Sequence, residues 1–181
     1  MKRETALALV KEHVQTKNLI KHLLAAEVIM RHLARHLGED EEEWGLAGLL
    51  HDIDYDQTKD NPKKHAVIGA KLLESEGVKP SIIQAVLAHA EKGPRQSLMD
   101  KALYATDPLT GLIVAAALIH PQKKLAAIDV EFVLNRFQEK SFARGADRTI
   151  IATCTDIGLG LKEFIAVGLK AMQEISGELG L

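Results

Sequence analysis

Apolar residues recur at intervals of three and four along most of the chain. The longest stripe consists of Leu19, Leu23, Ala26, Met30, Leu33 and Leu37. This spacing is typical of an amphipathic helix that buries one face. The alternation that marks half-buried strands does not persist anywhere. The pattern therefore predicts an all-α fold of roughly nine helices in one domain, residues 1–181.

Capping residues and helix breakers place the ends of these helices. Asn18 is the expected N-cap of the long helix that ends at Gly38, and Asp40 opens the next one. Pro62 is expected to begin a helix that ends at Gly77, and Pro108 to stop another at 106. The polar stretch 55–61 is expected to be a loop. The other predicted helices are 5–13, 80–90, 98–106, 109–120, 130–140, 146–155 and 159–175.

Composition narrows the class of protein. The 181 residues carry a formal net charge of -2, and the basic residues are scattered, so no nucleic-acid polymer is expected as a partner. Cys154 is the only cysteine, which excludes an internal disulfide. The N-terminal segment is amphipathic rather than a signal peptide, and no stretch is expected to be long enough to cross a membrane. Together these features favour the cytoplasm and no membrane partner.

The adjacent pair His51-Asp52 ends an apolar helix and is the main chemical signal. Burying both groups is costly without partners, and an imidazole beside a carboxylate is a good metal-binding pair. Alone, such a doublet is more often structural. Four further polar residues, His22, His65, His89 and Asp107, each interrupt an apolar segment. The ordered set H…HD…H…H…D is far more specific than the doublet.

This order resembles the HD superfamily of metal-dependent phosphohydrolases, and its HDIG-type members in particular. The matching segments read GLLHDIDYD, KKHAVIGAKLL, IIQAVLAHAE and LYATDPLTGLI. The resemblance covers a metal core of about residues 18–115. The C-terminal helical part, 121–181 with KSFARGADRTII, looks like the rest of a bacterial and archaeal family of HDIG-domain proteins.

The resemblance implies a role for each residue of the set. His22, His51, Asp52 and Asp107 match the positions that bind a first metal, and His65 and His89 match those for a second. Asp52 would then bridge one or two divalent ions of Fe, Mn, Co, Ni or Zn. Asp54 stands where the motif usually has glycine. It is expected either to orient water or shuttle a proton, or to be a solvated loop carboxylate or helix cap.

The implied reaction is hydrolysis of a phosphate ester by metal-activated water. A phosphomonoesterase or phosphodiesterase acting on a nucleotide or other small phosphorylated metabolite is the leading interpretation. Lys64, Arg144 and Arg148 are the candidates for binding the substrate phosphate, with ordinary surface positions as the alternative.

Two other functions remain open at this point. A few members of the superfamily are dinuclear iron oxygenases, and others are non-catalytic signalling domains that typically lack the metal ligands. Retention of all six residues argues against the second. The apolar segment 109–119 could form a homodimer interface, although a domain core is the more common use of such a helix.

Overall fold

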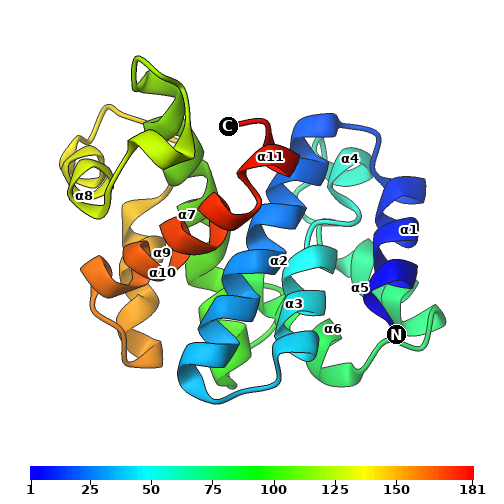
Figure 1. The fold of residues 1–181 in the computed structure, drawn as a ribbon. Helices are drawn as coiled ribbons and strands as arrows, with labels where there is room; N and C mark the ends of the chain where they lie inside the picture. Colours follow the sequence, from blue (N-terminus) through cyan, green and yellow to red (C-terminus); the bar gives the residue numbers. More distant parts are fainter.

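The chain forms α-helices and no strands (Figure 1). The computed structural model describes residues 1–181 and confirms the all-α prediction. The helices are α1 (Arg3–His13), α2 (Lys17–Leu37), α3 (Glu41–Leu50), α4 (Tyr55–Thr58), α5 (Val67–Ser75), α6 (Pro80–His89), α7 (Leu98–Ile119), α8 (Val130–Gln138), α9 (Arg148–Ala152), α10 (Leu161–Glu174) and α11 (Ser176–Leu179). Two short 3-10 helices, η1 (Leu125–Ala127) and η2 (Thr153–Ile157), complete them.

The pair α2 and α3 forms the middle of the molecule in Figure 1. Asp40 caps α3 by accepting hydrogen bonds from the backbone of Glu42 and Glu43, as its sequence position predicted. A Cβ on Gly48 would lie 2.6 Å from the backbone oxygen of Ala26, so only glycine allows the two helices to approach this closely. This approach brings the residue after α3, His51, against α2.

Helix α7 is the second element on which the candidate site is built. It runs unbroken from Leu98 to Ile119 with Pro108 inside it, so the predicted break at 106 was wrong. An internal proline costs about 3 kcal/mol because it lacks an N–H and crowds the preceding turn. Leu103, Leu109 and Leu112 are fully buried, and each contributes roughly 1.5–3 kcal/mol. Burial on both sides of the proline therefore outweighs its cost.

The uninterrupted α7 also meets the length and composition criteria of a membrane span. Its most apolar window has a mean hydropathy of 1.6, and 56% of that window is buried inside the protein. The expectation that no stretch reaches this length was wrong, because it divided the helix at Pro108. Burial in the core accounts for the apolar composition.

The segment before α5 differs from the prediction in a way that matters for the site. Pro62 does not begin the helix. Residues 62–66 form turns, and α5 starts only at Val67. Ala66 is fully buried and adopts the left-handed conformation with φ of 63°, which non-glycine residues rarely do. The turn that carries His65 is therefore held in place by packing around it.

Other boundaries shift by smaller amounts. Thr16, not Asn18, is the N-cap of α2, and the stretch predicted as a loop contains the single turn α4. The predicted helix 146–155 is the short α9 followed by η2. The one-turn helices α4 and α11 were not predicted, since their patterns are too short to recognise.

Candidate metal centre

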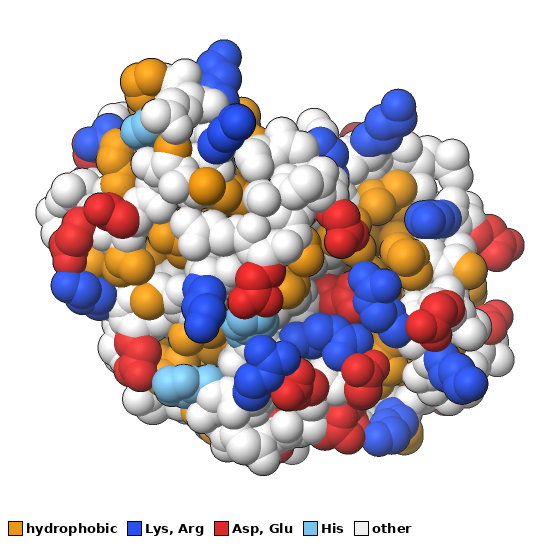
Figure 2. All heavy atoms as spheres, viewed as in Figure 1, with side chains coloured by type: hydrophobic (Ala, Val, Ile, Leu, Met, Phe, Trp, Pro, Cys, Tyr) orange, Lys and Arg blue, Asp and Glu red, His pale blue; other side chains and the backbone are white.

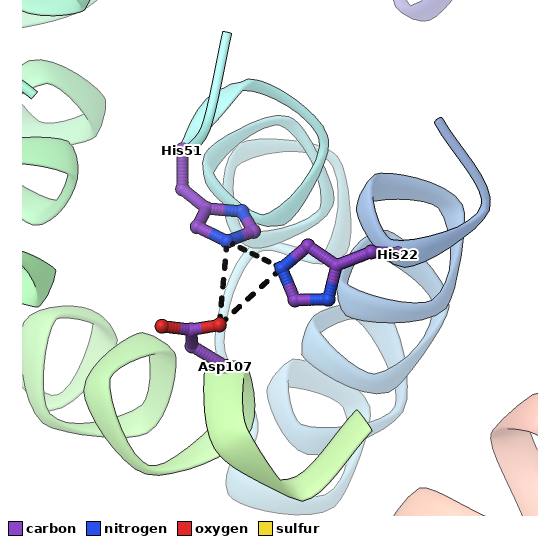
Figure 3. A group of neighbouring side chains, drawn as sticks. All are labelled: His22, His51 and Asp107. Atoms are coloured by element: carbon purple, nitrogen blue, oxygen red, sulfur yellow. Dashed lines mark hydrogen bonds and ion pairs between the residues drawn. The ribbon is translucent and has the colours of Figure 1, made fainter. Parts of the chain in front are cut away.

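Three side chains from distant parts of the chain converge on one point (Figure 3). His22 comes from α2, His51 from the end of α3 and Asp107 from the middle of α7. The Nε2 atoms of His22 and His51 are 3.0 Å apart, and Asp107 Oδ1 lies 3.3 Å from the first and 3.8 Å from the second. His51 is fully buried, whereas the Asp107 side chain is 37% exposed. The group is therefore anchored in the core and open on the side of α2 and α7.

The Asp52 carboxylate faces two groups of histidines at once. Its Oδ2 lies 3.6 Å from His22 Nε2 and 3.7 Å from His51 Nε2. Its Oδ1 lies 3.3 Å from the Nε2 atoms of both His65 and His89. This is the arrangement expected of a carboxylate that bridges two ions, and all six residues predicted as metal ligands lie in one cluster.

Every histidine of the cluster uses its Nδ1 atom for an oxygen outside the centre. The partners of His22 and His65 are Thr110 Oγ1 at 2.8 Å and Asp54 Oδ1 at 3.0 Å. Those of His51 and His89 are backbone carbonyls, of Gly48 at 2.8 Å and Val86 at 2.5 Å. Carbonyl and carboxylate oxygens only accept, so they fix the proton on Nδ1. Thr110 donates its own proton to the Asp107 carbonyl and accepts from His22.

This pattern leaves the four Nε2 atoms turned inward with their lone pairs. Two such atoms 3.0 Å apart, as in His22 and His51, need a positive charge between them. Ligand atoms about 2.1 Å from an ion such as zinc lie about 3.0–3.4 Å from one another, which matches most distances in the cluster. Imidazole nitrogens with their other nitrogen held by an oxygen are the common form of histidine metal ligands. The residues present therefore fit a divalent transition metal.

The electrostatics of the cluster favour a cation at its centre. Burial lowers the pKa of His51, but the carboxylates of Asp52 and Asp107 outweigh it and raise that pKa to about 9. Burial raises the pKa of Asp52, but His51 and His89 prevail and lower it to about 2. The pKa of Asp107 also falls well below its usual value, because His22 and His51 overcome the effect of burial. Without a metal, the carboxylates hold a proton on His51, and a metal ion can take its place.

Asp54 supports the cluster rather than entering it. Its Oδ1 accepts from His65 Nδ1, and its Oδ2 accepts from the backbone N–H of Gly69 at 2.7 Å. Burial raises the pKa of Asp54, while these two hydrogen bonds lower it below the usual value. Asp54 therefore orients His65, and it is buried rather than a solvated loop carboxylate. A Cβ on Gly69 would lie 3.3 Å from the side chains of Asp54 and Ile53, so the absence of a side chain lets Asp54 reach this N–H.

The three residues predicted to bind a phosphate have different surroundings. Lys64 is exposed and lies next to His65 in the chain, without an ion pair. Arg144 is exposed and makes no hydrogen bond or ion pair with the cluster. Arg148 donates all five of its N–H groups to backbone carbonyls, those of Arg136, Phe137, Phe142, Ala143 and Ala146. Arg148 has no donor left for a phosphate, and we withdraw it from the substrate-binding set.

Sequence reasoning missed the residues that orient the ligands. Thr110 lies three residues after Asp107, one turn along α7, so helical spacing alone could have suggested it. The Gly48 and Val86 carbonyls each lie three residues before the histidine they hold, within the last turn of a helix. A backbone carbonyl leaves no side-chain pattern in the sequence, so these two partners can be identified only from the folded backbone.

Comparison with known proteins gives a consistent result. The sequence model of the family described as HD domain matches residues 19–125. Ribonuclease Y of Oleidesulfovibrio alaskensis is 36% identical over 96 residues, which cover 53% of this chain and 18% of that protein. Ribonuclease Y of Desulfotalea psychrophila is 32% identical over 146 residues, or 78% of this chain and 28% of that protein. The chain thus spans less than a third of these relatives. No solved structure matches the chain.

Proposed function

The chain belongs to the HD-domain family, and we propose that it hydrolyses phosphodiester bonds with metal ions held by His22, His51, Asp52, His65, His89 and Asp107. The observation that carries this proposal is the uniform orientation of the four histidines, each with Nδ1 held by an oxygen and Nε2 turned inward. Histidines that only fill a protein core are not expected to point their Nε2 atoms at one shared carboxylate.

A bound divalent ion would lower the pKa of a water molecule, so that hydroxide is available near neutral pH, and would attract charge on a phosphoryl oxygen. The protein residues determine where this takes place. Asp52 turns one oxygen to each half of the cluster and so would hold two ions at a short separation. Buried His51 and His89 form the closed side, which excludes bulk water. His22 and Asp107, partly exposed, form the side through which a phosphate can enter.

The substrate class follows from the relatives together with the charge of the chain. The relatives are named as ribonucleases, which favours a ribonucleotide phosphodiester over the phosphomonoesters also considered from sequence. Figure 2 shows Lys and Arg side chains interspersed with Asp and Glu on the face drawn there, and Arg31–Glu42 and Arg35–Glu41 are examples of ion pairs in the protein. A face of such mixed charge offers no track for a long polyanion. We therefore propose a short oligoribonucleotide or dinucleotide as substrate.

The test begins with metal analysis of the purified protein. The protein is then loaded with Mn, Fe, Co, Ni or Zn and assayed on diribonucleotides, longer RNA and a panel of phosphomonoesters. We expect metal retention and cleavage of the short diesters. Phosphate release from monoesters alone would replace the diesterase assignment. Oxygen consumption by an iron-loaded centre, with no ester cleaved, would replace it with an oxygenase.

A further inference from the structure

A groove leads away from the metal cluster between α2 and α7, with residues 179–181 at its far wall. Its volume is about 400 Å³, within the roughly 300–1,000 Å³ of small-ligand sites. His22 and Thr110, which belong to the cluster and its support, are part of its lining. The groove therefore reaches the cluster at His22, whose side chain is partly exposed.

The groove has an apolar wall and one cation. Val114 and Leu118 from α7 and Leu179 from α11 supply apolar surface, and Leu118 is 50% exposed. Lys21, beside His22 on α2, is half-buried and has no acidic partner, unlike Arg31 and Arg35 further along the helix. Its ammonium lies over the backbone of Gly180, 3.0 Å from where a Cβ would be, so it stands at the edge of the groove.

Gly111 keeps this groove open. A Cβ on Gly111 would meet no atom within 4 Å, whereas one on Gly48 or Gly168 would meet a neighbour at under 3.0 Å. Packing therefore requires the other two glycines and does not require Gly111. A glycine in a helix interior costs about 1 kcal/mol relative to alanine, so α7 is weakened at the one point where a side chain would fill the groove.

We propose that this groove binds the nucleoside next to the scissile phosphate, with Lys21 on the following phosphate. This inference rests on the proposed function. The phosphate between the two nucleosides would lie at His22 and Asp107, a base would lie on Val114 and Leu118, and the Lys21 ammonium would meet the second anion. A substrate with two phosphates fits this arrangement, and a phosphomonoester leaves Lys21 without a partner.

The experiment measures binding of a 5′-phosphorylated diribonucleotide by titration calorimetry in the presence of a chelator, so that no turnover occurs. Gly111→Trp fills the groove, and Lys21→Ala removes its cation. Lys21→Ala is expected to weaken binding about tenfold or more, the effect of losing one charged hydrogen bond, and Gly111→Trp is expected to weaken it at least as much because the indole takes the space of the base. The controls are Gly160→Trp, a glycine with equally open surroundings outside the groove lining, and Lys170→Ala, an exposed lysine on α10. Both are expected to bind like the unchanged protein.

The inference is overturned if the unchanged protein does not bind the diribonucleotide, or if the groove variants bind as well as the controls. Circular dichroism of Gly111→Trp verifies that α7 still forms. A separate assay with metal restored measures hydrolysis. Groove-dependent binding without hydrolysis in any metal would refute the proposed function and leave the groove assignment in place, so the two failures are distinguishable.

Discussion

Two polar clusters inside this protein differ in how completely their hydrogen bonds are made. At Arg148, five N–H donors meet five backbone carbonyls, and the cluster needs nothing from outside the protein. At the metal cluster, four histidines and the Asp52 carboxylate face one another, with two Nε2 atoms 3.0 Å apart. The Arg148 cluster is therefore complete. The metal cluster is incomplete, because it requires a positive charge at its centre.

The difference separates a structural role from a functional one without reference to any relative. Buried polar groups are normally paired, so a set that is paired only on its outer side indicates a ligand on its inner side. Arg148, which its sequence position suggested as a phosphate contact, is paired at every donor and so indicates no ligand. Substitutions in the complete cluster should therefore lower the stability of the fold, and substitutions in the incomplete cluster should lower metal binding.

The largest expected effect is the loss of a ligand from the incomplete cluster. His51→Ala and Asp52→Ala should reduce bound metal to background, because each removes a ligand and Asp52 serves both halves. The drop in activity should exceed the 10–100-fold that loss of an outer partner costs. Elemental analysis and a diesterase assay measure both. Full metal content in the double variant would remove the assignment of the site.

The complete cluster gives the next largest effect. Arg148→Ala leaves five partly buried carbonyls without donors and should lower the free energy of unfolding by about 2–3 kcal/mol. For a chain of this length the melting temperature should fall by about 5–10 °C. Metal content per folded molecule should stay at the level of the unchanged protein. A loss of metal with unchanged melting temperature would reverse the distinction between the two clusters.

A smaller effect on metal affinity is expected from Asp54, which orients one histidine of the incomplete cluster. In Asp54→Asn, an amide replaces an acceptor that serves both His65 Nδ1 and the Gly69 N–H. Either Gly69 then faces an NH₂ group, or the amide turns and moves the His65 proton onto Nε2, where it blocks the metal. Affinity for the second ion should fall about 10–100-fold, with the first ion retained. Metal titration followed by calorimetry separates the two steps. Equal loss of both ions would mean that the halves are not independent.

Much of the fold was predictable from local patterns, and the misses have identifiable causes. Spacing of apolar residues found α2, and the side chain of Asp40 found the start of α3. The break predicted at Pro108 failed because burial in the core overrides the local preference of a proline. The start predicted at Pro62 failed because the chain instead forms turns that end in the strained Ala66. Tertiary packing decides both cases, and a local pattern does not contain it.

The candidate site shows the same division. The six predicted ligands lie together because each interrupts an apolar segment, a signal that survives in sequence. The parts that were not predictable are the backbone carbonyls of Gly48 and Val86 and the full occupation of Arg148. The sequence pattern of a loop with glycine and arginine before a helix is the same whether the arginine is free or fully hydrogen-bonded. Only the folded backbone shows which is the case.

The smallest predicted effect concerns Thr110, the hydroxyl that sequence analysis overlooked. Its Oγ1 accepts from His22 Nδ1 at 2.8 Å and donates to the Asp107 carbonyl at 2.8 Å, so it holds one ligand and is anchored beside another. Thr110→Val keeps the shape but leaves the His22 N–H without an acceptor, and first-ion affinity should fall about tenfold. Thr110→Ser keeps the hydroxyl and should bind metal like the unchanged protein. If neither valine nor serine weakens binding of the first ion, the hydrogen bond does not orient His22. If only valine does, the outer side of the incomplete cluster determines how well its inner side binds, and the comparison with Arg148 extends to single hydrogen bonds.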